Sequence, residues 1–174
     1  KFGESVKYLA NLAGMRPYTF SKEDEIREEK WNKYKLIYTK YVEFYHKDLF
    51  KNTLAKEAKD YLKNRNLTIE EVKKFKIGYV SNDEKFKEEI FKEFTESEIK
   101  ETGLFYFDEN KKKYVDRFRD RVIFPINNIS GDPIALGGRI LKDSKYLAKY
   151  INSPETPFFK KGSNLYNLDF TRKL

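Results

Sequence analysis

Hydrophobic residues recur with a helical period over the first hundred residues and with a period of two over much of the rest. Residues 2–13 carry apolar side chains at i, i+4, i+7 and i+8, which is typical of one face of a short helix. From Ser21 the pattern predicts a long helix of about 25 residues with an acidic first turn and an aromatic-rich face. Aromatic side chains interact at helical spacing wherever helices pack, so we interpret this face as core and not as a base-stacking platform. His46, the only histidine, lies on this helix and is interpreted as solvated or packed, because no second ligand has a metal-like spacing.

Shorter elements follow this helix. A second helix is predicted over 54–64, and Thr68 should cap a third, with Glu71 in capping-box spacing and Asn66 in a left-handed conformation before it. A short strand is predicted over 77–80, and two short helices are predicted within residues 83–102.

After Gly103 the hydrophobic period changes from 3.6 to 2, which predicts a β region. We expect a hairpin over 104–118 with its turn at 108–111, and then a buried strand from Arg121 to Pro125. A turn at 130–132 leads into a return strand over 134–141. The predicted fold class is α+β, with a helical amino-terminal half followed by a small mixed or antiparallel β-sheet. The predicted parts are a helix and linker (1–20), a mainly helical part (21–102) and a basic β-rich part (103–174).

Composition limits the protein class. The chain has 174 residues, 39% of them hydrophobic and 17% aromatic, which is enough for one hydrophobic core. The absence of cysteine excludes disulfides and thiolate zinc sites and favours a reducing, cytosolic setting. No run approaches the roughly 18–20 apolar residues that a membrane-spanning helix needs. The sequence begins with Lys1 inside an amphipathic pattern, and we interpret it as a piece of a larger protein.

The net charge of +8 is unevenly distributed. Residues 1–110 carry 22 Lys and Arg against 22 Asp and Glu, whereas residues 111–174 carry 14 against 6. The excess positive charge therefore lies in the β-rich part of the sequence, where an anionic partner would bind.

Three arginines alternate in this basic part, at Arg117, Arg119 and Arg121. On a strand they would share one face and repel one another, while Asp116 and Asp120 would project to the opposite face. Two interpretations stay open: salt bridges to acids elsewhere in the fold, or binding of an external anion, which we favour.

A second motif, Gly137-Gly138-Arg139, interrupts a predicted strand and allows either a bulge or the close approach of another backbone or a ligand. Cations, one aromatic ring and an amide follow it within about 20 residues, in a loop that prolines stiffen, and this mixture suits single-stranded nucleic acid or a nucleotide. The residues are Lys149, Tyr150, Asn152, Lys160 and Lys161. No catalytic residue or metal ligand is predicted, because the chain has no phosphate-binding glycine loop and no nucleophile with a partner base, and its basic half has no carboxylate cluster with metal-like spacing.

Several segments resemble a known family. Residues 118–126, 131–141 and 149–168 closely resemble the amino-terminal part of the RNA-polymerase core of bacterial replicative DNA primases, of the DnaG type. Residues 61–80 resemble the helical motif upstream of that part, and residues 2–15 are similar to the segment that leads out of the family's zinc-binding domain. The departures are local, and they are Asn66 where Gly is usual, Leu136 where an aromatic is common, and about two extra residues between Arg139 and Lys149.

The resemblance implies a DNA-directed RNA polymerase that makes RNA primers for replication in the bacterial cytoplasm. It implies Mg²⁺ in a Toprim subdomain and Zn²⁺ in a zinc-binding domain, both outside this sequence, so the chain would hold no cofactor and be catalytically incomplete alone. The implied partners are single-stranded DNA template, ribonucleoside triphosphates, the RNA–DNA primer hybrid and the replicative helicase, the last through a region not present here. No membrane partner is expected, and the protein should be a monomer. The residues implied to bind nucleic acid or nucleotide, with Arg117 added from the arginine series, are Arg65, Arg117, Arg119, Arg121, Arg139, Lys149, Tyr150, Asn152 and Lys161.

Two alternatives from other classes remain. One is a non-enzymatic module of a phage or plasmid replication protein that binds single-stranded nucleic acid. The other is a basic structural domain that contacts an acidic protein.

Overall fold

The computed structural model describes residues 2–15, 21–142 and 145–172, and the chain divides into two compact units, residues 1–32 and 33–174. The helices are α1 (Phe2–Leu12), α2 (Lys22–Lys51), α3 (Lys56–Asn64), α4 (Ile69–Lys74), α5 (Lys85–Glu93), α6 (Glu96–Thr102) and α7 (Leu168–Thr171), with 3₁₀ turns η1 (Thr53–Ala55) and η2 (Lys161–Ser163). The strands are β1 (Gly78–Val80), β2 (Phe105–Asp108), β3 (Lys113–Asp116), β4 (Arg121–Asn127), β5 (Pro133–Ile140) and β6 (Tyr150–Asn152). The predicted α+β class is confirmed, while the predicted boundaries at residues 20 and 102 stay a prediction.

The first unit contains α1, which the hydrophobic pattern predicted over 2–13. It is followed by Gly14 in the left-handed region, with φ of 64°. The amide of Met15 donates to the carbonyl of Ala10 across 2.9 Å and so closes the helix end. Tyr8, Leu9 and other apolar residues of α1 are exposed in this unit.

The aromatic face of α2 is core, as predicted. Tyr38, Tyr41 and Tyr45 are fully buried. The hydroxyl of Tyr38 donates to the carbonyl of Thr102 across 2.9 Å, so its polar end has a hydrogen-bond partner inside the core. The helix extends over 30 residues, longer than the roughly 25 expected. Burial of the tyrosines on one side makes α2 the support on which the rest of the second unit packs.

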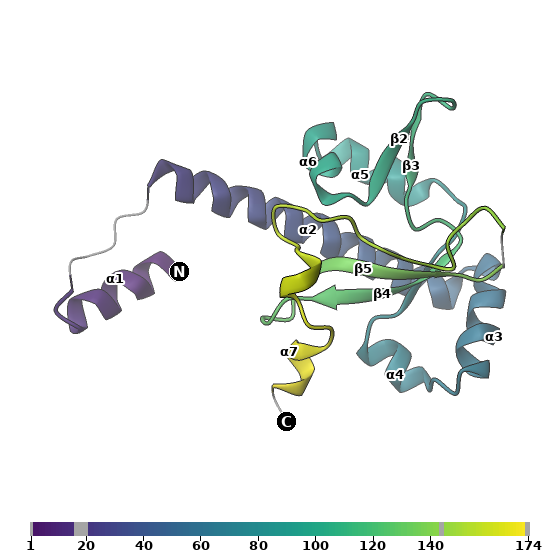
Figure 1. The fold of residues 1–174 in the computed structure, drawn as a ribbon, viewed down its shortest axis with the longest axis horizontal. Helices are drawn as coiled ribbons and strands as arrows, with labels where there is room; N and C mark the ends of the chain where they lie inside the picture. Colours follow the sequence, from purple (N-terminus) through teal and green to yellow (C-terminus); the bar gives the residue numbers. More distant parts are fainter. Residues whose placement is uncertain (1, 16–20, 143–144, 173–174) are drawn as a thin grey trace. The chain divides into compact units, whose positions relative to one another are not determined.

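Four antiparallel strands form the main sheet in the order β1-β4-β5-β6. The register aligns Gly78, Ile123, Gly138 and Ile151 in one row across the sheet. This row faces α2, because a Cβ on Gly78 would lie 2.9 Å from the backbone carbonyl carbon of Tyr45. In Figure 1 α2 accordingly passes behind β4 and β5.

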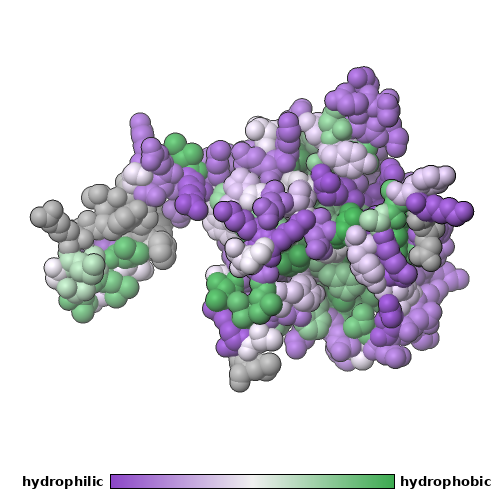
Figure 2. Space-filling view, viewed as in Figure 1, coloured by the Kyte–Doolittle hydropathy of each residue, from purple (hydrophilic) through white to green (hydrophobic). Residues whose placement is uncertain are grey.

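The opposite face of the sheet packs against α3 and α4. Val122 of β4 belongs to one buried cluster with Ala58 and Leu62 of α3 and Val72 of α4. Figure 1 shows both helices below the strands, and in Figure 2 hydrophobic residues gather beneath β4 and β5 while the tip of the β2–β3 hairpin is hydrophilic. Side chains of the β5–β6 end that point to this face therefore lie on the side of α3.

Two capping boxes fix the short helices. Thr68 caps α4 with Glu71, and Thr95 caps α6 with Glu98, in both cases with reciprocal side-chain and backbone hydrogen bonds. Asn66 adopts φ of 58°, which confirms the left-handed position predicted for it. The predicted strand at 77–80 and the two helices within 83–102 are also present as β1, α5 and α6.

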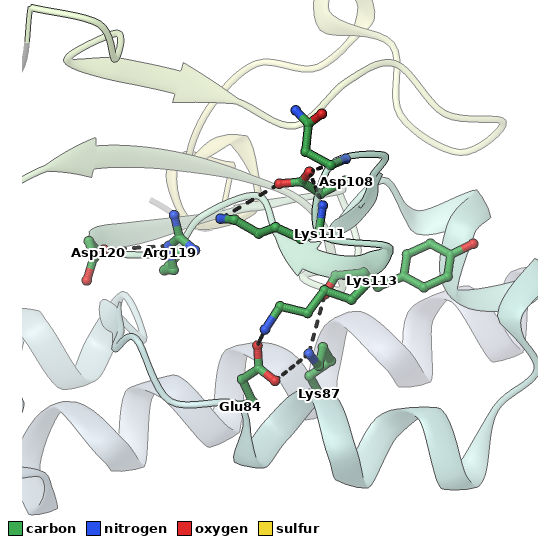
Figure 3. A network of polar contacts seen from close by, with 9 residues as sticks. Glu84, Lys87, Asp108, Lys111, Lys113, Arg119 and Asp120 are labelled. Carbon is green, nitrogen blue, oxygen red and sulfur yellow. Dashed lines mark hydrogen bonds and ion pairs between the residues drawn. The ribbon is translucent and has the colours of Figure 1, made fainter.

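The predicted hairpin is β2–β3, joined by a turn over residues 109–112. Its turn end is held to the start of α5 by Glu84, whose carboxylate contacts Lys87 at 2.7 Å and Lys113 at 2.8 Å (Figure 3). These two lysines hold the pKa of Glu84 down at about 2, Lys113 contributing more. The contacts are solvent-exposed, so they orient the hairpin more than they stabilise it.

Three details of the β region differ from the sequence-based expectation. Strand β4 continues past Pro125 to Asn127, and Gly137-Gly138 makes no bulge; the register irregularity lies at Ile126–Asn127. The segment after Lys149, expected as a loop, contributes strand β6. Only pairing with β5 could reveal a strand of three residues, because so short a segment has no periodicity of its own.

Within the described ranges, none of the helices is long and apolar enough to cross a membrane.

His46 is half-buried, with its Nδ1 2.7 Å from the carbonyl oxygen of Ile77, which confirms its packing role.

Candidate nucleic-acid interface

The candidate interface lies where the β5–β6 end of the sheet meets α3. The register places Tyr79, Val122, Arg139 and Tyr150 opposite one another across the four strands. Residues directly opposite in antiparallel strands share a face, so Arg139 and Tyr150 point to the side on which Val122 packs against α3. Tertiary structure thus brings the Gly-Gly-Arg motif and residues 149–152 together at the α3 side of the sheet.

Arg139 is held by three contacts. Its guanidinium carbon lies 4.1 Å from the centre of the Tyr61 ring, and its Nη1 donates to the carbonyl of Ile140 across 2.8 Å. Its guanidinium also interacts with the hydroxyl of Tyr150, and this interaction, more than the other positive charges nearby, holds the pKa of Tyr150 below its usual value. The buried Nε of Arg139 has no hydrogen-bond partner among the described residues.

Arg65 at the end of α3 completes the cluster. Its Nε donates to the hydroxyl of Tyr61 across 3.3 Å, and Tyr150 adds a weaker electrostatic interaction. The hydrogen bond that Arg65 donates to Tyr61, followed by the electrostatic effects of the Tyr61 and Tyr150 hydroxyls, raises the pKa of the exposed Arg65. We call Tyr61, Arg65, Arg139 and Tyr150 the arginine–tyrosine cluster.

The cluster carries positive charge that no described carboxylate neutralises. Neither Arg65 nor Arg139 forms an ion pair with any Asp or Glu in the described parts of the chain. Two guanidinium groups beside a Tyr150 side chain that is 60% exposed offer phosphate-binding forks next to a stacking ring. This is the chemistry that single-stranded nucleic acid and nucleotides require.

Three other predicted site residues lie near Tyr150 in sequence, two of them beside it and the third in η2. Asn152 is opposite Gly137 and so shares the face of Arg139, and a Cβ on Gly137 would lie 3.3 Å from Asn152 Oδ1. Lys149 is exposed at the entrance to β6, next to the cluster in sequence. Lys161 begins η2, where its backbone amide donates to Glu155 Oε1 across 3.3 Å, and none of its described contacts is with the cluster.

The arginine series does not form a strand face, so that prediction was wrong. Residues 117–120 form a turn between β3 and β4, and Asp120 has φ of 59°. A left-handed residue breaks the alternation of side chains on which a common face depends. The three arginines therefore take three different environments.

Arg117 and Arg119 lie on the surface near the hairpin. The Nε of Arg117 donates to the carbonyl of Gly103 across 2.8 Å, and its guanidinium carbon lies 5.6 Å from the centre of the Tyr106 ring. Arg119 contacts Asp120 at 3.7 Å (Figure 3). Neither contact places them in the arginine–tyrosine cluster.

Arg121 is buried, with 4% of its surface exposed, and burial lowers the pKa of its guanidinium. It lies opposite Ile140, one residue from Arg139, so the two arginines point to opposite faces of the sheet. Asp116 also points inward, where it accepts hydrogen bonds from Tyr41, Tyr45 and the Phe118 amide. Both groups serve the interior of the fold.

Sequence reasoning missed one member of the cluster, Tyr61. The available signal was its spacing of four residues from Arg65, which directly follows the helix predicted over 54–64, so that both side chains lie on one face of its last turn. Its contact with Arg139, 78 positions away, has no sequence signature.

Comparison with known proteins gives the family. The family described as DNA primase catalytic core, N-terminal domain, matches residues 44–172. The chain belongs to this family. A DNA primase from Clostridium acetobutylicum is 38% identical over 99% of the chain, and one from Enterococcus faecalis is 34% identical over 99%. The chain spans less than a third of the length of these curated relatives, 28% and 29%.

Solved primase structures share the fold. The RNA polymerase domain of Mycobacterium tuberculosis primase DnaG, in complex with a double-stranded DNA oligomer with a 6-nucleotide overhang, superposes with a TM-score of 0.75 and 26% identity, over 82% of this chain and 44% of that one. A DnaG primase catalytic domain bound to single-stranded DNA gives a TM-score of 0.71 and 29% identity over 84% of this chain and 45% of that one. These primase relatives support the α+β assignment and lend nothing to the phage or plasmid alternative.

Proposed function

We propose that this chain forms the nucleic-acid- and nucleotide-binding wall of a primase catalytic core, within a protein that synthesises RNA primers on single-stranded DNA. The observation that carries the proposal is the arginine–tyrosine cluster. Its two arginines form no ion pair with a carboxylate in the part of the chain that the structure describes, and they lie beside an exposed aromatic ring. Membership of the primase family and the DNA-bound solved relatives support it.

The binding chemistry follows from the residue types. Arg65 and Arg139 would contact phosphate oxygens through their planar donor groups, and a base would stack on Tyr150. Lys149 and Lys161 would add contacts that depend on charge and not on sequence, and Asn152 would offer an amide to a base or sugar. We therefore expect binding that tolerates any base sequence and weakens with salt.

Catalysis would need groups that the described residues do not supply. Within the described ranges, no group of three or more His, Asp or Glu is arranged to bind a metal ion. These residues therefore do not fit a Mg²⁺ or Zn²⁺ site. We propose that both ions are held elsewhere in a longer primase and that the chain alone does not polymerise. Ribonucleoside triphosphates, the primer hybrid and the helicase are proposed partners of that longer protein, which would act as a monomer at the bacterial replication fork.

The proposal is tested by titrating a fluorescently labelled oligo-dT with the chain and following anisotropy at several salt concentrations. Binding should be weak and should fall steeply with salt, because each phosphate contact releases counterions. Arg139→Ala should weaken binding more than Arg117→Ala, the matched control, whose guanidinium is committed to Gly103 and Tyr106. Salt-independent binding by the unmodified chain, or no binding at low salt, contradicts the proposed function.

A further inference from the structure

Tyr61 contacts both arginines of the cluster with different parts of its side chain. The face of its ring lies 4.1 Å from the guanidinium carbon of Arg139, while its hydroxyl accepts a hydrogen bond from Arg65 Nε at 3.3 Å. The guanidinium carbon of Arg65 is 5.7 Å from the ring centre, which is also within reach of the negative ring face. A single side chain on α3 thus connects the end of its own helix with β5.

This connection can hold the two arginines in one arrangement. Two neighbouring guanidinium groups repel each other, and each side chain can adopt many rotamers. In the cluster this repulsion is not offset by a carboxylate among the described residues. The ring of Tyr61 supplies a negative face without a formal charge, so it can attract Arg139 without cancelling the charge that a phosphate would bind.

Tyr61 is itself fixed by the core. Its ring is partly buried against the cluster that includes Leu62, Ala58 and Val122. Arg139 is fixed at its other side, where Nη1 donates to the Ile140 carbonyl. The position of the guanidinium is therefore set before any ligand arrives, which reduces the entropy lost on binding.

We propose that Tyr61 is a positioning residue of the nucleic-acid interface, holding Arg139 by its ring and Arg65 by its hydroxyl so that both present their donors to one bound phosphate-bearing strand. The inference rests on the proposed function and goes beyond it, because Tyr61 would act through the arginines and not by touching the ligand.

A double-mutant cycle on the 174-residue chain tests the role of the ring. Oligo-dT affinity is measured by anisotropy for the unmodified chain, Tyr61→Leu, Arg139→Ala and the double variant. Tyr61→Leu should weaken binding on the order of tenfold, because it removes the ring contact with Arg139 and the hydroxyl contact with Arg65 together. In the Arg139→Ala background the same change should weaken binding only about two- to threefold, because the ring then has no Arg139 to hold and only the hydroxyl contact with Arg65 is still lost. The proposal is overturned if the affinity loss of the double variant equals the product of the two single losses, or if Tyr61→Leu leaves the affinity unchanged.

Tyr61→Phe tests the hydroxyl and stays informative if the Leu variant is poorly folded. It keeps the ring contact with Arg139, so it should lose only about two- to threefold in affinity, and this loss should disappear in an Arg65→Ala background. A loss that persists there contradicts the role assigned to the hydroxyl.

Phe75→Leu is the packing control. Phe75 is a ring partly buried against the same core cluster, but its described ring contacts are with Phe170 and Lys74. Thermal unfolding should show a comparable loss of stability for Phe75→Leu and Tyr61→Leu, whereas only Tyr61→Leu should change DNA affinity. Equal affinity losses in both would mean that Tyr61 acts through packing. If the unmodified chain binds no DNA, the proposed function fails as well; if it binds and the cycle is additive, only the role of Tyr61 fails.

Discussion

Arg121 donates a hydrogen bond from Nη1 to the carbonyl oxygen of Lys149 across 3.3 Å, so a buried cation ties the start of β4 to the entrance of β6. The same backbone oxygen accepts from the amide of Ile140 at 3.0 Å. Arg121 thus holds the strand that carries Tyr150 in place from the opposite face of the sheet.

Replacing this residue should mainly destabilise the fold. Arg121→Ala removes a charged hydrogen bond and a buried aliphatic stem, and we expect a loss of about 2 kcal/mol in the free energy of unfolding. Chemical denaturation measures this directly. Arg119→Ala is the control, and it should cost less than about 1 kcal/mol because its pairing with Asp120 is solvent-exposed. Unchanged stability for Arg121→Ala together with lost DNA binding would place Arg121 in the binding site.

Gly138 cannot accept a side chain without rearrangement. A Cβ at this position would lie 2.6 Å from Cδ1 of the buried Phe118 ring and 3.2 Å from Cδ of Arg121. Gly138→Ala should therefore lower stability by roughly 1–3 kcal/mol, the cost of overpacking. Gly162→Ala, where nothing lies within 4 Å, should change little. Part of the loss should return when Phe118→Leu is added, and a fully tolerated Gly138→Ala would contradict the close approach.

Asp116 should make stability depend on pH in an unusual direction. Desolvation raises its pKa from 3.8 to about 6, although the hydrogen bonds from Tyr41, Phe118 and Tyr45 oppose the rise. The folded state therefore binds a proton more readily than the unfolded state between these two values, and this contribution to stability is lost as pH rises from about 4 to about 6. Asp116→Asn should remove the dependence. The difference in urea midpoint between the two proteins, followed from pH 4 to 8, should change across this window, and a constant difference would contradict the raised pKa.

Lys149 and Lys161 are exposed and should act on binding alone. Each change to Ala should weaken oligo-dT binding and reduce the slope of log affinity against log salt by about one, because one phosphate contact is lost. Circular dichroism should show an unchanged fold. Unfolding of either variant would mean that the lysine is structural. An unaltered salt slope would mean that the lysine lies away from the bound DNA.

Much of this protein was determined by sequence alone, wherever the decisive interactions are local. The capping boxes at Thr68 and Thr95 join residues three positions apart, and the aromatic spacing of α2 already identifies its buried face. The segments from 118 to 168 were also specific enough to indicate the primase family, and the family match over 44–172 confirms it.

Only the tertiary structure decided which of the candidate cations act together. Alternation in sequence predicts a shared face only if the residues lie on a strand, and the turn at 117–120 with its left-handed Asp120 put Arg121 inside the fold. The cluster depends on pairings between residues 61–65 and residues 139–150 that arise when the sheet packs against α3. Contacts over such separations are set by the packing of whole elements, which no local pattern encodes, and for that reason the contact of Tyr61 with Arg139 could be found only in the folded chain.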